Sequence, residues 1–227
     1  MYVRHFNYMI NPRLIVTDDG SPTLYREDID ECYHSTHGAI TESRYIFIQQ
    51  ALQHRIDIGH TGELKIFELG LGTALNATLC AMTDHKIYYA AIEKYPIGQQ
   101  LAASIDFGTG IDHQLFNDIH LAPWNQLVNI TPNFKLHKIL GDFNHLNIDT
   151  KFDVIFMDAF SPEKQADLWT ADSLFRLSDM LLPRGVLTTY CAKGHIRRIF
   201  KSFGLIAERL PGPPGGKREI LRITKPE

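Results

Sequence analysis

From residue 64 onward, short apolar runs typical of buried strands alternate with segments of helical spacing. The expected strands cover residues 64–69, 86–93, 135–140, 152–157, 185–191, 205–210 and 219–224. The expected helices between them cover residues 73–82, 96–105, 167–182 and 195–203. This alternation predicts an α/β fold with a mainly parallel seven-stranded sheet covered on both faces. The last two strands are joined without a helix, so we expect them to form an antiparallel hairpin at one edge.

The first 60 residues do not follow this alternation. A hairpin is expected over residues 2–17, around Asn11-Pro12, and a helix over residues 42–53. We therefore expect an N-terminal extension, residues 1–60, packed on a main domain of residues 61–227. Residues 107–132 have no clear period and are expected to form a helix followed by a loop near the site.

Composition excludes several classes of protein. No run approaches the roughly 18 apolar residues of a membrane helix, and the N-terminus lacks a signal-peptide pattern, so a cytoplasmic protein without membrane contact is expected. The three cysteines, Cys32, Cys80 and Cys191, are far apart, which argues against a disulfide framework. His34 and His37 are at helical spacing, but no further ligands complete a cluster, and no metal site is expected.

Charge is distributed unevenly along the chain. Residues 184–227 hold ten Lys and Arg against three Glu, a balance of +7, which leaves 13 basic and 23 acidic residues, or −10, for residues 1–183. A basic region of this kind can follow a phosphate backbone, and it can equally be a solvated surface. Charge alone leaves both interpretations open.

The first strand runs into a glycine turn, 67-FELGLGTALN-76, and then into a helix that Thr73 is placed to cap. Such a turn between a strand and a helix is where a parallel sheet binds a nucleotide-like cofactor. The glycines Gly70 and Gly72 let the backbone approach a ligand closely. A dinucleotide fingerprint would have a third glycine at position 75, where this chain has Leu75.

Four carboxylates follow the first four strands: Glu68, Glu93, Asp142 and Asp158. Gathered at the carboxyl ends of the strands, their negative charges would repel a phosphate-bearing cofactor. They suit S-adenosylmethionine, which carries a sulfonium, an amino group and a ribose diol. Glu93 stands 21 residues after Gly72, where a carboxylate accepts hydrogen bonds from a ribose. Each acid taken singly is equally compatible with a helix cap or a surface position.

Asp142 would then reach the adenine amino group, with Phe143 beside the ring. The predicted cofactor-binding residues are Glu68, Gly70, Gly72, Thr73, Asn76, Glu93, Lys94, Asp142, Phe143 and Asp158.

Several motifs follow one another in an order that carries a family resemblance. They are Asp19-Gly20, Asp30, Tyr33, Ser35, Glu42-x-Arg44-Tyr45-x-Phe47, Asp158-Ala159-Phe160-Ser161-Pro162, Trp169-Thr170, Gly194, Arg197-Arg198 and Lys217-Arg218-Glu219. Over residues 18–222 the chain resembles the tRNA 5-methylaminomethyl-2-thiouridine methyltransferases of the MnmC type, which are class I, Rossmann-like enzymes. It departs from their usual pattern at Ala159, where glycine is usual, and at Ser161, where alanine is common; both are small.

The resemblance implies transfer of a methyl group from S-adenosylmethionine to the amine of a 5-aminomethyl-uridine, with or without a 2-thio group, at the tRNA wobble position. Asp158 would be the catalytic carboxylate that removes the amine's proton. Phe160 would wall the pocket of the flipped base, although it could equally belong to the core. Basic side chains would hold anticodon-loop phosphates. The predicted substrate-binding residues are Tyr33, Ser35, Phe160, Lys193, Arg197, Arg198, Lys217 and Arg218.

The bifunctional members of that family carry a fused flavin-dependent oxidoreductase. Nothing follows Glu227 here, so the stand-alone methyltransferase form, without a flavin domain, is expected.

Three other functions compete with this one. An aminopropyltransferase resembling spermidine synthase also attacks with an amine in an acidic pocket, but it leaves the basic C-terminal region unexplained. A nicotinamide oxidoreductase is disfavoured by Leu75 and by the ring of carboxylates. A tRNA-binding protein without catalysis would have no need of a carboxylate at Asp158.

Overall fold

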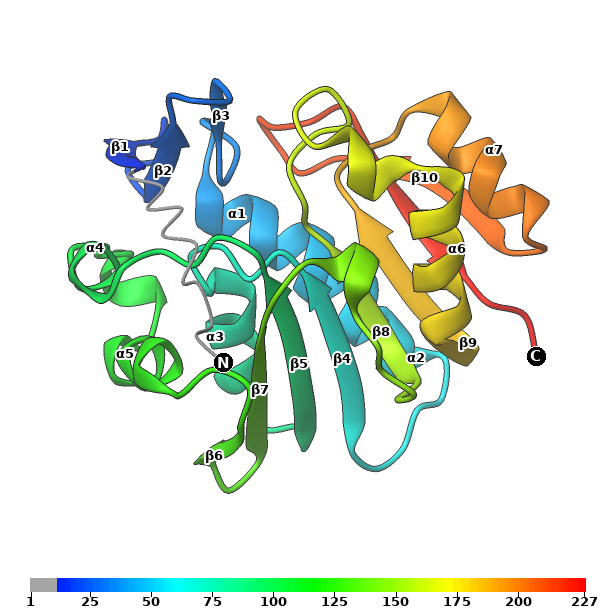
Figure 1. Ribbon diagram of the computed structural model, residues 1–227, viewed down its shortest axis with the longest axis horizontal. Coiled ribbons are helices and arrows are strands. Elements are labelled where there is room, and N and C mark those ends of the chain that lie inside the picture. Colours follow the sequence, from blue (N-terminus) through cyan, green and yellow to red (C-terminus); the bar gives the residue numbers. More distant parts are fainter. Residues whose placement is uncertain (1–11) are drawn as a thin grey trace, which may run out of the picture.

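The computed structural model describes residues 12–227, and within them eight strands form one central sheet (Figure 1). The strand order is β10-β11-β9-β8-β4-β5-β7-β6. Five neighbouring strands are parallel: β4 (Leu64–Leu69), β5 (Ile87–Glu93), β7 (Phe134–Leu140), β8 (Phe152–Met157) and β9 (Leu181–Thr189). Antiparallel strands flank them: β6 (Leu127–Thr131), β10 (Ile206–Pro211) and β11 (Glu219–Thr224). The predicted α/β class and the antiparallel edge hairpin are confirmed.

The sheet has one strand more than predicted. Strand β6 lies in the stretch of residues 107–132, which was expected to hold only a helix and a loop. Its residues are exposed or half-buried along their whole length, so it lacks the apolar run that reveals an inner strand. Strand β9 begins at Leu181, inside the predicted helix over residues 167–182, because Leu181 already pairs with Phe152.

Helices cover both faces of the sheet. Helices α6 (Ala171–Met180) and α7 (Gly194–Ser202) lie on one face, and α3 (Leu75–Ala81) and α5 (His113–Leu121) on the other (Figure 1). Helix α4 (Gln99–Ala103) is shorter than expected, and Pro96 lies outside it. Short 3₁₀ turns complete the set: η2 (Gly108–Gly110), η3 (Phe143–His145) and η4 (Ala166–Trp169).

The helix predicted over residues 42–53 is part of a longer continuous helical segment. It comprises α1 (Ala39–Ser43), the π-helical η1 (Arg44–Gln53) and α2 (His54–Asp57). Its apolar side packs on the sheet, where the rings of Phe47 and Phe156 lie 5.2 Å apart. Ile155, the residue of β8 just before Phe156, points to the opposite face of the sheet, into the core under α6 and α7. Alternate residues of β8 therefore serve the two cores, as the pleat of a strand requires.

A small three-stranded antiparallel sheet precedes this segment: β1 (Arg13–Val16), β2 (Pro22–Arg26) and β3 (Glu31–Cys32). The hairpin expected over residues 2–17 lies largely outside the described residues; of that range, Arg13–Val16 pairs with β2. Residues of the small sheet and of the loop after it line a cavity together with residues at the carboxyl ends of the central strands. The small sheet therefore lies over that edge of the central sheet.

Candidate functional site

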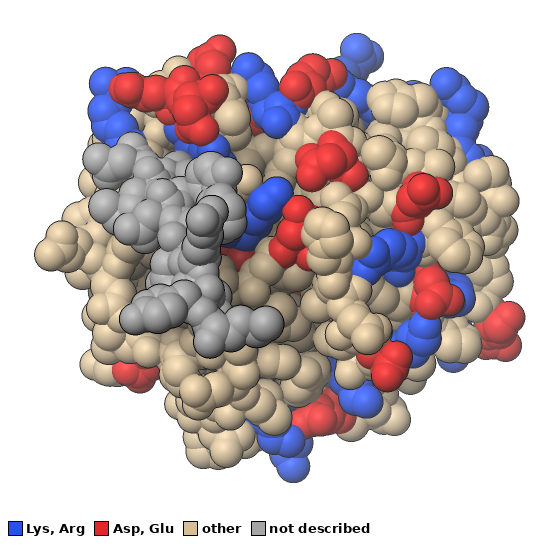
Figure 2. Space-filling model, viewed as in Figure 1, with Lys and Arg blue, Asp and Glu red and all other residues tan. Residues whose placement is uncertain are grey.

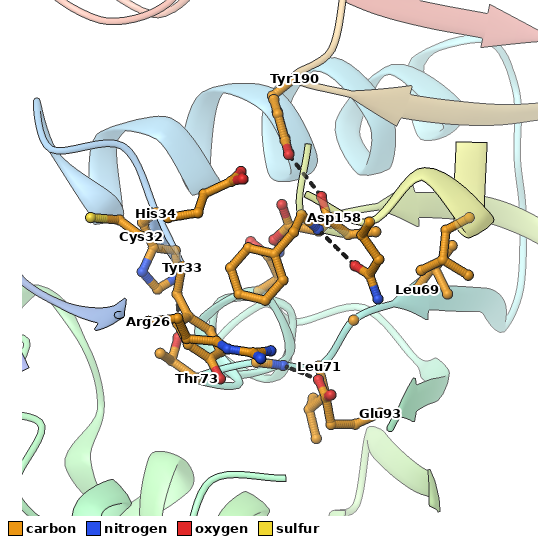
Figure 3. Close-up of a pocket in the computed structure, with 18 of the residues that line it drawn as sticks. Arg26, Cys32, Tyr33, His34, Leu69, Leu71, Thr73, Glu93, Asp158 and Tyr190 are labelled. Carbon is orange, nitrogen blue, oxygen red and sulfur yellow. Dashed lines mark hydrogen bonds between the residues drawn. The ribbon is translucent and has the colours of Figure 1, made fainter. Parts of the chain in front are cut away.

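A cavity of about 550 Å³ opens at the carboxyl ends of β4, β5 and β8. This is the edge at which open parallel sheets bind ligands, and the size suits a drug-sized molecule. Figure 3 shows Arg26, Tyr33 and His34 from the N-terminal segment on one side of the cavity, facing Asp158 and Leu69 on the other.

The glycine turn forms the floor of the cavity. Gly70 has a φ of +92°, and a Cβ there would lie 3.0 Å from the carbonyl oxygen of Asp158, so a side chain is excluded on both counts. Thr73 does not cap the helix as predicted. Its Oγ1 pairs with Nε2 of His34 at 3.1 Å, and Ala74, in a left-handed conformation, occupies the N-cap position without a side-chain cap.

Two acids lie at the inner wall of the cavity, joined by one amide. The Asn76 Nδ2 group donates to Glu68 Oε1 and to Asp158 Oδ2, both at 2.9 Å. Burial raises the pKa of Glu68 to about 8, partly offset by the hydrogen bond from Asn76. Burial, with the negative charges of Glu68 and Glu42, also raises the pKa of Asp158 well above its usual value. A carboxyl group in such surroundings can take up a proton near neutral pH.

Two further acids lie where the cofactor's sugar and base are expected. The carboxylate of Glu93 accepts from the backbone N–H of Gly72 at 3.0 Å and of Tyr95 at 2.8 Å. Asp142 pairs with Lys94 Nζ at 2.9 Å. Burial alone would raise the pKa of Asp142, but the hydrogen bonds from Lys94 and from the backbone of Asn144 outweigh it and hold the pKa below its usual value.

These residues fit S-adenosylmethionine. Asn76 Oδ1 is buried and, within residues 12–227, has no hydrogen-bond partner, so it can accept from a donor on a ligand. The carboxylate of Glu93 has lone pairs left for ribose hydroxyls after its two backbone bonds. An acidic inner wall favours a cationic sulfonium and amine. All the predicted cofactor-binding residues except Glu68 line the cavity, and Glu68 is held directly behind them by Asn76.

The predicted substrate-binding residues divide into two sets. Tyr33, Ser35, Phe160 and Lys217 line the cavity, with the rings of Tyr33 and Phe160 edge to face at 5.1 Å. The remaining four lie outside its lining as the described residues define it: Lys193, Arg197, Arg198 and Arg218.

Much of the basic C-terminal region is paired with acids. Ion pairs join Lys193 to Glu163, Arg184 to Glu227, Arg209 to Glu219 and Arg222 to Glu208. Figure 2 shows Lys and Arg interspersed with Asp and Glu over the face it presents. Three of the paired acids, Glu208, Glu219 and Glu227, are already counted in the balance of +7 for residues 184–227, so among these four pairs only Lys193–Glu163 brings in an acid from outside the region.

Several cavity residues had no role predicted from sequence. The Arg26 guanidinium lies 5.4 Å from the ring centroid of Phe160 and 5.6 Å from that of Tyr95. Glu31 accepts from Ser161 N at 3.0 Å and from Ser161 Oγ at 2.7 Å. These residues come from the N-terminal segment, whose irregular pattern gave no placement at the sheet edge.

Two more cavity residues without a predicted role are Tyr190, just after β9, and Glu42, in α1. Tyr190 Oη donates to the carbonyl of Ala159 at 2.8 Å, which holds the loop after β8. Glu42 is buried in a helix among Ala39, Ser43 and Ile46. An acid one helical turn before Ile46, and therefore on the same buried side of the helical segment, was the signal that could have revealed it.

No group of three or more metal-ligating side chains occurs in the part of the chain that the structure describes. Among the same residues, no helix is long and apolar enough to cross a membrane.

Residues 109–226 match the family model described as S-adenosyl-L-methionine-dependent methyltransferase. Curated relatives include two proteins named tRNA 5-methylaminomethyl-2-thiouridine biosynthesis bifunctional protein MnmC. The one from Pseudomonas syringae pv. tomato is 28% identical over 223 residues, covering 90% of this chain and 33% of the relative. The one from Pseudomonas fluorescens is 30% identical over 212 residues, covering 85% and 32%. The chain spans about a third of the length of these relatives.

Solved structures share the fold. The crystal structure of MNMC2 from Aquifex aeolicus has a TM-score of 0.74 at 22% identity and covers 96% of this chain and 72% of that one. A probable spermidine synthase from Corynebacterium glutamicum has a TM-score of 0.55 at 16% identity, covering 95% and 76%.

Proposed function

We propose, from the premise that the chain belongs to the S-adenosyl-L-methionine-dependent methyltransferase family, that it methylates a tRNA. The substrate would be the primary amine of 5-aminomethyl-uridine or its 2-thio form at the wobble position, and the product 5-methylaminomethyl-uridine or its 2-thio form. The curated relatives named for this modification, aligned over 85% and 90% of the chain, support the substrate class.

The observation that carries the proposal is the position of Asp158. Its carboxylate lies at the end of β8, beside the glycine turn, and Asn76 fixes it at 2.9 Å. When bound, S-adenosylmethionine supplies a methyl group on a sulfonium, which is already an activated leaving group. The residues of the chain must then orient the amine and remove its proton, because an ammonium nitrogen has no lone pair with which to attack. A carboxyl group whose pKa is raised by burial is suited to accept that proton.

The cofactor would be held by the two halves of the sheet edge. Glu93 would accept from the ribose hydroxyls, and Asp142 from the adenine amino group with Phe143 beside the ring. The turn at Gly70 and Gly72 would carry the backbone under the ligand. The further residues proposed for the cofactor are Glu68, Thr73, Asn76, Lys94 and Asp158.

The substrate base would enter between Tyr33 and Phe160, since aromatic rings stack on unpaired bases. Ser35 and Lys217 would complete the pocket. The residues outside the cavity, Lys193, Arg197, Arg198 and Arg218, would meet the phosphates of the anticodon loop from further out. We also propose that residues 1–60 act as an extension packed on a methyltransferase domain of residues 61–227, and that the protein works in the cytoplasm with its tRNA.

Methyl transfer from labelled S-adenosylmethionine to bulk tRNA tests the proposal. The tRNA should come from cells that lack this methylation, and the product nucleosides should be separated. Labelled 5-methylaminomethyl-uridine with the wild type, and its loss in Asp158→Asn, are expected. Label or product in free polyamines, with none in tRNA, would favour a small-amine transferase instead. Cofactor binding without turnover on either would favour a tRNA-binding protein.

A further inference from the structure

Glu42 brings a further carboxylate to the cavity, from α1 rather than from the end of a central strand. Its side chain is 10% exposed, and its Oε2 accepts from the backbone N–H of Ser35 at 2.7 Å. Its other oxygen, Oε1, is buried without a hydrogen-bond partner among residues 12–227. A buried carboxylate oxygen without a hydrogen-bond donor is costly unless a cation or donor approaches it.

The surroundings of this oxygen already accommodate an alkylammonium group. Lys217 Nζ lies 3.9 Å from Glu42 Oε1, beyond hydrogen-bond length, and 4.0 Å from the ring centroid of Tyr190. A carboxylate beside an aromatic face is a favourable environment for a cation. Lys217 comes from the loop between β10 and β11, so its side chain can leave without disturbing the sheet.

The charges of Glu42 and Lys217 both act on Asp158. The charge of Glu42 is one of the causes, after burial and Glu68, that raise the pKa of Asp158. The charge of Lys217 acts in the opposite direction on both Asp158 and Glu42. A cation at the place of Lys217 Nζ therefore interacts with both carboxylates.

We propose that Glu42 binds the ammonium group of the incoming substrate, opposite Asp158, at the place that Lys217 Nζ takes in this structure. The proposal rests on the function proposed above. Burial raises the pKa of the Glu42 carboxyl, while a neighbouring positive charge lowers it, so an ammonium bound beside Glu42 favours the ionised form that holds the nitrogen. One N–H bond of the ammonium then breaks, the proton forms an O–H bond on Asp158, and the electron pair remains on nitrogen for the attack. Glu42 is thus a specificity residue for substrates that carry a small primary amine.

Binding of two anticodon stem-loop RNAs tests this without turnover. The RNAs should be identical except for the wobble base, which is 5-aminomethyl-uridine in one and uridine in the other, with S-adenosylhomocysteine present. Fluorescence anisotropy should show that the wild type prefers the amine-bearing RNA by about tenfold or more, as for a charge-assisted hydrogen bond. In Glu42→Gln the preference should fall below about threefold, and Glu42→Asp should restore part of it.

Glu63→Gln is the matched control, because Glu63 is an acid paired with Lys135 just before β4, at the opposite end of that strand from the site. It should keep the wild-type preference. Lys217→Met should raise the preference for the amine-bearing RNA severalfold, since it removes the competing ammonium. If Glu42→Gln fails to bind S-adenosylhomocysteine, the preference of Lys217→Met still tests the role of Glu42.

Each outcome separates the two proposals. A wild type that prefers the amine and methylates tRNA, beside a Glu42→Gln variant with the same preference, overturns the role of Glu42 and leaves the proposed function standing. A fall in preference in Lys217→Met also overturns it. A wild type that neither methylates tRNA nor prefers the amine overturns both.

Discussion

The two halves of one sheet edge hold their carboxylates in opposite ways. At the ends of β4 and β8, Glu68 and Asp158 are joined by a neutral amide, and burial raises the pKa of both. At the ends of β5 and β7, Glu93 accepts from two backbone N–H groups, and Asp142 pairs with Lys94. Carboxylates at equivalent strand ends thus differ in their donors: Glu68 and Asp158 share one side-chain amide, whereas Glu93 has two backbone N–H groups and Asp142 has a lysine ammonium.

The difference suggests a division of labour. Acids that lack a cationic partner can exchange a proton, which is what removal of a proton from an amine requires. Acids whose oxygens accept from fixed donors keep fixed acceptor positions, which is what recognition of a sugar and a base requires. We therefore expect substitutions in the first half to affect turnover and those in the second half to affect cofactor affinity.

The largest effect is expected from Asp158→Asn. Loss of the proton acceptor should lower the single-turnover rate of methyl transfer by roughly 10²–10⁴-fold. Affinity for S-adenosylmethionine, measured by calorimetry, should change much less. A variant that transfers methyl groups at more than a tenth of the wild-type rate would remove Asp158 from the role proposed for it.

Glu93→Gln should have the next largest effect, in the other half of the edge. Replacing a charged acceptor by an amide weakens its hydrogen bonds, so the dissociation constant for S-adenosylmethionine should rise about tenfold. The turnover rate at saturating cofactor should stay within about threefold of the wild type. A large fall in that rate with unchanged affinity would contradict the proposed division.

The raised pKa of Glu68 predicts how the stability of the ligand-free protein depends on pH. Its pKa in the folded protein is about 8, above the ordinary value of 4.5. The folded state therefore binds the proton more tightly, and stability present at low pH is lost as the pH rises toward 8. In Glu68→Gln the fall in Tm between pH 5 and pH 8.5 should be smaller by at least about 3 °C, given roughly 2–4 °C per kcal/mol for a chain of this size. Equal slopes in thermal melts of the two proteins would show that Glu68 is ionised in the folded state.

The smallest effect is expected outside the cavity. Arg198, exposed on α7, lies in the proposed phosphate-binding region, so Arg198→Gln should weaken tRNA binding about two- to threefold and reduce the salt slope by at most about one. Lys86→Gln, an exposed residue just before β5 at the opposite end of that strand, serves as the control and should leave both unchanged. Identical salt slopes for the wild type and both variants would place the RNA elsewhere.

Much of the central sheet was predictable because strands such as β5 and β8 are largely apolar runs with a carboxylate at or just after the end. The bounds of β4, β8 and β11 match the expected ranges residue for residue. The edge strand β6 was missed because an exposed strand carries no such run.

At the site, the sequence indicated the acids at the strand ends but not their partners. The pairing of Asp142 with Lys94, and of Thr73 with His34, depends on side chains brought together by the fold. No spacing along the chain reports such contacts. For the same reason the sequence did not predict that Arg26 and Glu31 line the cavity.

The helical segment over residues 39–57 has a consequence for how the protein is made. Its Tyr45 hydroxyl donates to the carbonyl of Pro211 at 3.0 Å, and Gln50 Oε1 accepts from Arg222 at 3.3 Å. During synthesis this early segment must wait for β8 to leave the ribosome before Phe47 can pack on Phe156, and for β10 and β11 before these hydrogen bonds can form. Contacts of such long sequence separation slow folding and leave apolar surface open to aggregation. Part of the apolar side therefore stays open until β8 has emerged, and a chaperone that shields residues 39–57 would act in that interval.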